Sequence, residues 1–84
     1  MKHANQRSSL SFAQASKGEF IMLSDACYAE TAGVWFPERG TMFLVDVDAF
    51  DRAVDEGEEY APVIRPMVGV RTRWDAMEAV VAAN

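Results

Sequence analysis

Two apolar segments joined by a short turn constrain the fold of this chain more than any other feature. Residues 32–36 and 41–45 are rich in β-branched and aromatic side chains, which favour β-strands. Between them lies a Pro-Glu-Arg-Gly turn, in which Pro37 presets a negative φ and Gly40 reaches the left-handed conformation without strain. The pattern predicts an antiparallel β-hairpin over residues 32–45, in which Gly40 serves backbone conformation rather than recognition.

An acidic segment follows the hairpin. Seven of the thirteen Asp and Glu residues lie within residues 46–59 and only Arg52 opposes them, so seven negative charges less one positive give −6, against −5 for the whole chain. On a helical projection of roughly 100° per residue, apolar and acidic side chains fall on opposite arcs. The segment predicts an amphipathic helix over about 47–57, with Asp46 or Asp48 as its N-cap and Gly57 as its end. The apolar arc holds Val47, Phe50, Ala53 and Val54, and the acidic arc holds Asp48, Asp51 and Asp55.

Three further segments complete the predicted elements. Residues 19–24 form a short apolar run of strand length. Residues 63–70 have strand composition, but Pro66 cannot donate a ladder hydrogen bond, which predicts an edge strand or two short pieces. Thr72, with Asp75 three residues later, comes close to a capping box and predicts a helix over about 73–83.

The predicted fold is α+β. It consists of a small, mostly antiparallel sheet of three or four strands around the hairpin, with the helices at about 47–57 and 73–83 packed on one face. The 84 residues predict a flexible polar arm at residues 1–9 and a single small globular domain at residues 10–84, with the conformation up to residue 18 left open. The residues expected to be mostly buried are Phe20, Met22, Val34, Phe36, Phe43, Val45, Phe50, Val54, Met77 and Val80.

The sequence predicts neither an enzyme nor a metal or cofactor site. Its only histidine, His3, lies in the predicted arm, where nothing holds it near a nucleophile. Its only cysteine, Cys27, excludes an internal disulfide and a cysteine-based zinc site, and is expected to be a small buried hydrophobe. The stretch from Asp46 fails as an EF-hand loop, because Phe50 stands at loop position 5 and Gly57 at position 12.

Charge and hydropathy restrict the partners and the compartment. A net charge of −5 disfavours nucleic acid and anionic membranes, and no apolar run reaches the roughly 20 residues that span a bilayer. With a lone thiol and no visible secretory signal, a cytoplasmic location is expected. Arg65, Arg71 and Arg73 stand near Trp74, which could stack a base. We favour the alternative that these arginines pair with the acidic segment or flank the last helix, and whether they form a second binding surface stays open.

Surface recognition is the remaining predicted function. Acidic side chains spaced along a helix imitate the charge of a phosphate backbone and suit a basic, nucleic-acid-binding surface of another protein. Two alternatives stay open: the acidic face only keeps an ordinary helix soluble, or the working surface is apolar. An apolar surface would serve a homodimer or a small regulatory partner of a helix-turn-helix transcription factor. The candidate partner-binding residues are Asp48, Asp51, Asp55, Glu56, Glu58, Glu59 and Tyr60.

Two resemblances bear on these expectations. A small acidic domain without a catalytic set resembles phage-encoded inhibitors, including anti-CRISPR and other DNA-mimic proteins, in physical style, so no residue is carried over. The stretch from Arg7 to Glu59, a strand and a hairpin with Gly40 followed by an apolar strand and a helix, resembles the short BldB-like proteins that accompany helix-turn-helix regulators. The chain departs from that second pattern because it lacks a tryptophan near its start and another on the acidic helix, and it adds the C-terminal helix.

Overall fold

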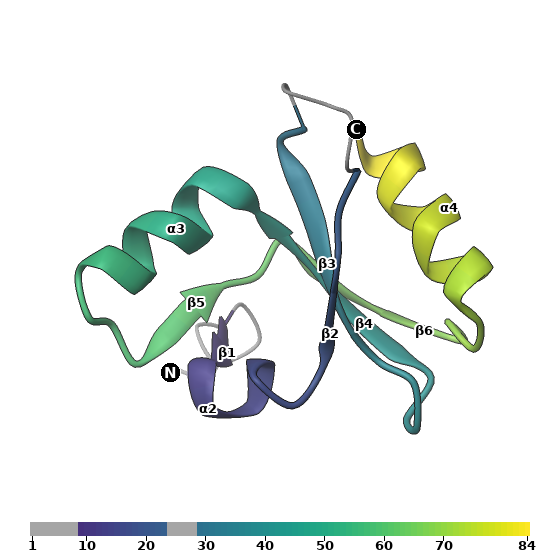
Figure 1. The fold of residues 1–84 in the computed structure, drawn as a ribbon, viewed down its shortest axis with the longest axis horizontal. Helices are drawn as coiled ribbons and strands as arrows, with labels where there is room; N and C mark the ends of the chain where they lie inside the picture. Colours follow the sequence, from purple (N-terminus) through teal and green to yellow (C-terminus); the bar gives the residue numbers. More distant parts are fainter. Residues whose placement is uncertain (1–8, 24–28) are drawn as a thin grey trace, which may run out of the picture.

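The computed structural model describes residues 9–23 and 29–84 (Figure 1). His3, Cys27 and residues 1–8 of the predicted arm lie outside the described residues, so the expectations placed on them stay predictions. Ser9, the last residue of that arm, begins the first strand. In chain order the elements are β1 (Ser9–Ser11), α2 (Phe12–Ala15), β2 (Glu19–Ile21), β3 (Thr31–Phe36), β4 (Thr41–Asp46), α3 (Val47–Asp55), β5 (Tyr60–Pro62), β6 (Arg65–Val68) and α4 (Arg73–Ala83).

A four-stranded antiparallel sheet with strand order β2-β3-β4-β6 forms the centre of the fold. The β3–β4 hairpin is paired from Thr31 opposite Asp46 to Phe36 opposite Thr41. In its turn Gly40 has a φ of 65°, and the Gly40 N–H donates to the Phe36 carbonyl at 3.0 Å. A separate two-stranded sheet pairs β1 with β5. The α+β class, the antiparallel sheet and the central hairpin are therefore confirmed.

The acidic helix α3 has a defined cap at each end. The Asp46 side chain accepts a hydrogen bond from the Ala49 N–H at 2.9 Å, so the structure selects the first of the two predicted N-caps. Gly57 follows the helix with a φ of 72°, and the Glu58 N–H donates back to the Ala53 carbonyl at 2.9 Å. This pattern is a Schellman C-cap, and it ends the helix two residues before the predicted boundary.

Side chains also cap α4 at both ends. Thr72 Oγ1 accepts from the Asp75 N–H at 3.0 Å, and the Asp75 carboxylate accepts from the Thr72 N–H at 3.2 Å, which confirms the capping box. At the other end, Asn84 Oδ1 accepts from the N–H groups of Glu30 and Thr31 at 2.9 and 3.0 Å. The end of α4 is thereby tied to the start of β3.

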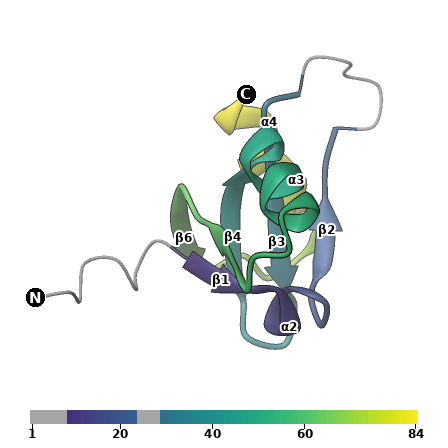
Figure 2. The same ribbon diagram turned by 90° about the vertical axis from the view of Figure 1, so that its left-hand side faces the viewer.

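The two long helices cover opposite faces of the sheet (Figures 1 and 2). Neighbouring residues of β3 show the division, because Trp35 packs in a core with α4 whereas Val34 packs in a core with α3. Phe50 of α3 lies against Phe20 of β2, with ring centroids 5.6 Å apart. The expectation that both helices share one face is wrong. All six residues of β3 are buried, so this strand needs apolar cover on both sides.

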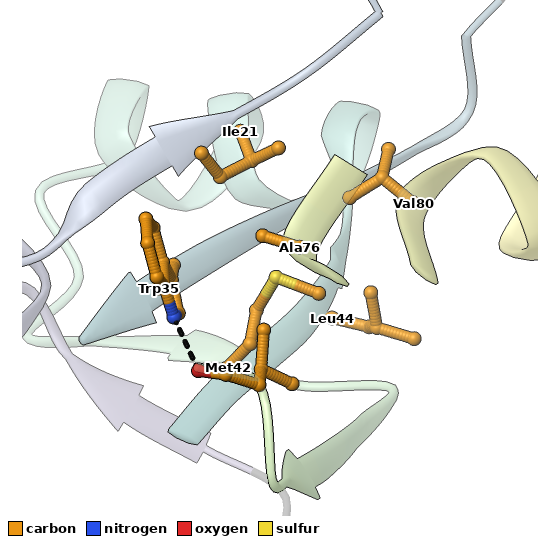
Figure 3. Close-up of a cluster of buried hydrophobic side chains, with 7 residues drawn as sticks. Ile21, Trp35, Met42, Leu44, Ala76 and Val80 are labelled. Atoms are coloured by element: carbon orange, nitrogen blue, oxygen red, sulfur yellow. Dashed lines mark hydrogen bonds between the residues drawn. The ribbon is translucent and has the colours of Figure 1, made fainter. Parts of the chain in front are cut away.

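The core is accordingly split into two clusters. One lies between the sheet and α4 and is named the α4 core (Figure 3); the other lies on the α3 side and is named the α3 core. Strand alternation sends adjacent side chains of β3 and β4 into different clusters. The α4 core contains Ile21, Trp35, Met42, Leu44, Val70, Ala76 and Val80, and the α3 core contains Leu10, Ala32, Val34, Phe36, Val45 and Val63.

Three residues expected in the core are exposed instead. Phe20 is 49% exposed, Met22 37% and Val54 53%. The predicted parity of β2 is wrong, because Ile21 is the residue that enters a core from this edge strand. On α3, the buried position is Ala53, one residue earlier than Val54. Of the other residues expected in the core, Val34, Phe36, Val45 and Val80 are buried, and Phe43, Phe50 and Met77 are half-buried.

The segment around Pro66 forms an edge strand over Arg65–Val68, the first of the two predicted alternatives, and another short strand, Tyr60–Pro62, lies before it where a loop was predicted. β5 pairs with β1, and β6 pairs with β4 at the edge of the larger sheet. Pro66 stands opposite Phe43 on this edge strand, where its missing N–H interrupts only one ladder. Between the strands, the Ile64 N–H donates to the Leu44 carbonyl at 2.7 Å.

Candidate functional site

The predicted partner-binding residues are brought together on α3 and on the turn that leads from it into β5 (Figure 1). The three aspartates belong to α3, the three glutamates to the turn, and the tyrosine to the first position of β5. Every one of these side chains is exposed. This set is named the acidic surface: Asp48, Asp51, Asp55, Glu56, Glu58, Glu59 and Tyr60.

The helix and the small sheet together hold the acidic surface in place. Ala53, on the opposite side of α3 from the aspartates, is buried and anchors the helix. Beyond the helix, the Phe12 N–H donates to the Glu59 carbonyl at 3.1 Å, and Tyr60 pairs with Ser11 in the β1–β5 ladder. The turn is therefore fixed by the N-terminal strand, a contact between segments far apart in the sequence.

The charge of the acidic surface is not compensated within the part of the chain that the structure describes. That part contains one ion pair, between Arg73 and Glu19 at 2.6 Å. The acidic-surface carboxylates accept no side-chain hydrogen bond from any described residue, whereas the Asp46 carboxylate is occupied as the helix cap. Arg52, the single cation of the acidic segment, forms no ion pair with its described neighbours.

A shallow hollow of about 390 Å³ adjoins the acidic surface between α3 and the β1–β5 sheet. Arg52, Glu56, Glu58 and Tyr60 are among the residues that line it, so two carboxylates and a phenol ring border the same depression. Its open shape suits the side chain of a protein partner better than an enclosed small molecule.

The three C-terminal arginines do not pair with the acidic segment. Arg73 pairs with Glu19 of β2, and its guanidinium carbon lies 5.9 Å from the centroid of the Trp35 ring. Arg71 and Arg73 flank the start of α4, so that part of the expectation is confirmed, whereas the pairing with the acidic run is wrong. Arg65 belongs to the edge strand β6.

Residues 9–23 and 29–84 contain no group of three or more His, Cys, Asp or Glu side chains placed to hold a metal ion. None of the helices in these two stretches is long and apolar enough to cross a bilayer. The acidic surface presents its charge on an exposed face.

Two features of the surface were not indicated by the sequence. Trp74 is 79% exposed and Val68 83% exposed, although both stand in segments with apolar composition. Lys17, Arg39 and Arg71 gather around the β3–β4 turn, where they line two adjoining hollows. These three cations come from distant segments of the chain, so no local pattern could have joined them.

Comparison with known proteins gave no match: no family model, no curated protein and no solved structure matches this chain. The surface and its charges are therefore the basis for a functional proposal.

Proposed function

We propose that this protein is a non-enzymatic binding protein of the cytoplasm, an inhibitor or modulator that docks its acidic surface on the basic, nucleic-acid-binding surface of another protein. The observation that supports this proposal is the uncompensated charge: within residues 9–23 and 29–84, no carboxylate of the acidic surface takes part in an ion pair. Exposed charges of one sign accelerate encounter with a partner of opposite sign. Phage anti-CRISPR and other anti-defence proteins, which the chain resembles in physical style, are the model for this role.

The spacing of the carboxylates supports imitation of a phosphate backbone. Asp48 and Asp55 are seven residues apart on α3, which separates them by about 10 Å along the helix axis. A DNA duplex carries about six phosphate charges over that length. Over that length α3 holds three aspartates, about half the charge of the duplex, and the following turn adds three glutamates.

The hollow beside α3 adds a place for a specific contact. An arginine of the partner could enter between Glu56 and Glu58 and lie against the ring of Tyr60. Tyr60 is 53% exposed, so part of its ring is available for such stacking. This contact would add short-range selectivity to the long-range attraction of the acidic surface.

Charge reversal on α3 tests the proposal. The parent protein is first used to capture its partner from the native host, and association is then followed by surface plasmon resonance at several salt concentrations. In the double variant Asp51→Lys with Asp55→Lys, we expect the association rate constant at low salt to fall about tenfold or more. Its dependence on salt should also become flatter, because fewer screened attractions remain.

A matched variant separates the acidic surface from net charge. Glu38→Lys with Glu78→Lys changes the net charge by the same +4 at two exposed positions away from α3. We expect this control to bind within about threefold of the parent. Unchanged binding of the α3 variant would show that the acidic surface only keeps the helix soluble, and equal loss in both variants would show that no particular face docks.

The second candidate function is a homodimer or a regulatory partner of a helix-turn-helix transcription factor that uses an apolar surface. The observation in its favour is the exposure of Trp74 and Val81 on α4, at 79% and 54%. These residues are seven positions apart and so lie on one side of the helix. A dimer that persists at low micromolar concentration in sedimentation would favour this candidate.

A further inference from the structure

Arg39 and Arg71 both lie beside the β3–β4 turn, at the end of β4 that is remote from α3. They line a hollow of about 330 Å³ in which two of the other lining residues are glycines with positive φ, Gly40 at 65° and Gly69 at 77°. These glycines carry no side chain that would fill the hollow. The hollow is lined by Pro37, Glu38, Arg39, Gly40, Gly69 and Arg71.

The core of the protein holds the two arginine-bearing segments together. The Val70 N–H donates to the Gly40 carbonyl at 2.9 Å. The Val70 carbonyl accepts from Trp35 Nε1 at 2.8 Å, the dashed line in Figure 3. Val70 is itself buried, so the backbone just before Arg71 is fixed against the turn. A methyl group at Gly40 would lie 3.9 Å from Cγ of Arg71, which places the Arg71 side chain over the residue next to Arg39.

Arg39 also borders a second hollow, of about 370 Å³, on the other side of the turn. Its guanidinium carbon lies 5.4 Å from the ring centroid of the buried Phe36, which orients the side chain. This second hollow is also lined by Lys17 and Gln14. Within the described residues, neither Arg39, Arg71 nor Lys17 takes part in an ion pair.

We infer that the paired hollows bind a compact phosphate compound, with the phosphate held between the guanidinium groups of Arg39 and Arg71 and the remainder of the ligand lying toward Phe36 and Lys17. Arginine presents a planar fork of N–H donors that matches phosphate oxygens. Each hollow falls within the roughly 300–1,000 Å³ range of small-molecule sites. Glu38 also lines both hollows and opposes any anion, so the three cations Lys17, Arg39 and Arg71 face one carboxylate. The small size of the hollows favours a small phosphate compound over a nucleic-acid strand.

Titration with pyrophosphate at low ionic strength tests the site, with amide chemical shifts as the measurement. Saturable shifts are expected at residues 38–41 and 69–72. Arg39→Met and Arg71→Met should each weaken binding about tenfold, since each removes hydrogen bonds between charged groups. Arg65→Met, which removes the same charge from an exposed residue that lines neither hollow, should change it less than about twofold. Equal loss in all three variants would overturn the site in favour of general charge attraction.

Titrations with other ligands identify the class of compound that binds, and one variant separates this site from the acidic surface. ADP should bind at least as tightly as pyrophosphate, whereas a DNA oligonucleotide without terminal phosphates and a glutamate-rich peptide should bind more weakly. Tighter binding of either polymer, or no saturation by pyrophosphate up to about 10 mM, would overturn the inference. The variant Asp51→Lys with Asp55→Lys should keep its pyrophosphate binding, because its changes lie on α3. If this variant loses protein docking but keeps pyrophosphate binding, the phosphate site is supported independently of the acidic surface.

Discussion

At the scale of single residues, Gly40, Val70 and Trp35 form one connected unit. The Gly40 carbonyl accepts from the Val70 N–H, and the Val70 carbonyl accepts from the Trp35 indole. A buried indole N–H needs such a partner, because an unpaired donor in the core would lower the stability of the folded protein. The unit ties the hairpin turn to the segment that leads into α4. Trp74, a residue of the same type, is exposed.

Replacing Gly40 with valine should lower the free energy of unfolding by about 1–2 kcal/mol. The main cause is backbone strain, because φ is 65°, whereas the nearest atoms to a new Cβ would be at an ordinary 3.9 Å. Thermal unfolding followed by circular dichroism would measure the change. Gly40→Asn is the control and should lose less, since asparagine tolerates the left-handed region. A Gly40→Val variant that melts with the parent would mean that the turn lacks this conformation.

At the scale of elements, Asn84 fastens α4 to β3 across the α4 face of the sheet. Its Oδ1 accepts from the N–H groups of Glu30 and Thr31, and its Nδ2 donates to the carbonyls of Thr31 and Val80. One side chain thus completes four hydrogen bonds for backbone groups at the end of a helix and the start of a strand. Such groups lack partners within their own elements.

Asn84→Asp should lower the free energy of unfolding by about 1–3 kcal/mol. The carboxylate can still accept from Thr31 N–H, but it cannot donate and it would face the Thr31 and Val80 carbonyls. Urea denaturation measures the stability, and hydrogen exchange should show faster exchange of the Thr31 amide. Glu78→Gln, an exposed change of comparable size on the same helix, serves as the control. Parent-like stability and exchange in the Asp variant would contradict this role of Asn84.

At the scale of the whole molecule, a small chain divides its apolar residues between two cores on opposite faces of one sheet. β3 contributes to both, which explains why all six of its residues are buried. The charged features are divided as well: the acidic surface belongs to α3 and its turn, and the hollow lined by Arg39 and Arg71 lies beside the β3–β4 turn. The sheet thereby carries two chemically different surfaces on separate parts of the fold.

The division of the core predicts how mutations combine. Ile21→Val should cost about 0.5–1.5 kcal/mol, and Val80→Ala and Val63→Ala about 1.5–3 kcal/mol each. Ile21 and Val80 share the α4 core, so their effects should couple by about 0.5 kcal/mol or more, whereas Ile21 and Val63 lie in different cores and should add within about 0.5 kcal/mol. Urea unfolding of the single and double variants measures the coupling energy in both double-mutant cycles. Equal coupling energies for the two pairs would show that the two faces of the sheet share one core.

The features that the sequence determined by itself depend on near neighbours in the chain. The hairpin follows from two apolar segments around Pro37 and Gly40, and the capping box follows from Thr72 and Asp75, three residues apart. The exposed acidic arc of α3 follows from helical periodicity, which needs only the positions of Asp48, Asp51 and Asp55. Each of these features is stabilised by contacts within a few residues, so its information lies in one stretch of sequence.

Only the tertiary structure decided which side of each element is buried and which distant residues meet. Residues 20–23, in and after β2, are all apolar, so the alternation of side chains along a strand does not show which side faces the core. Packing against α4 buries Ile21 rather than Phe20. The pairing of β1 with β5 and the meeting of Arg39 with Arg71 join segments more than thirty residues apart. Such contacts form through the burial of shared apolar surface, a property of the assembled core that no local pattern encodes.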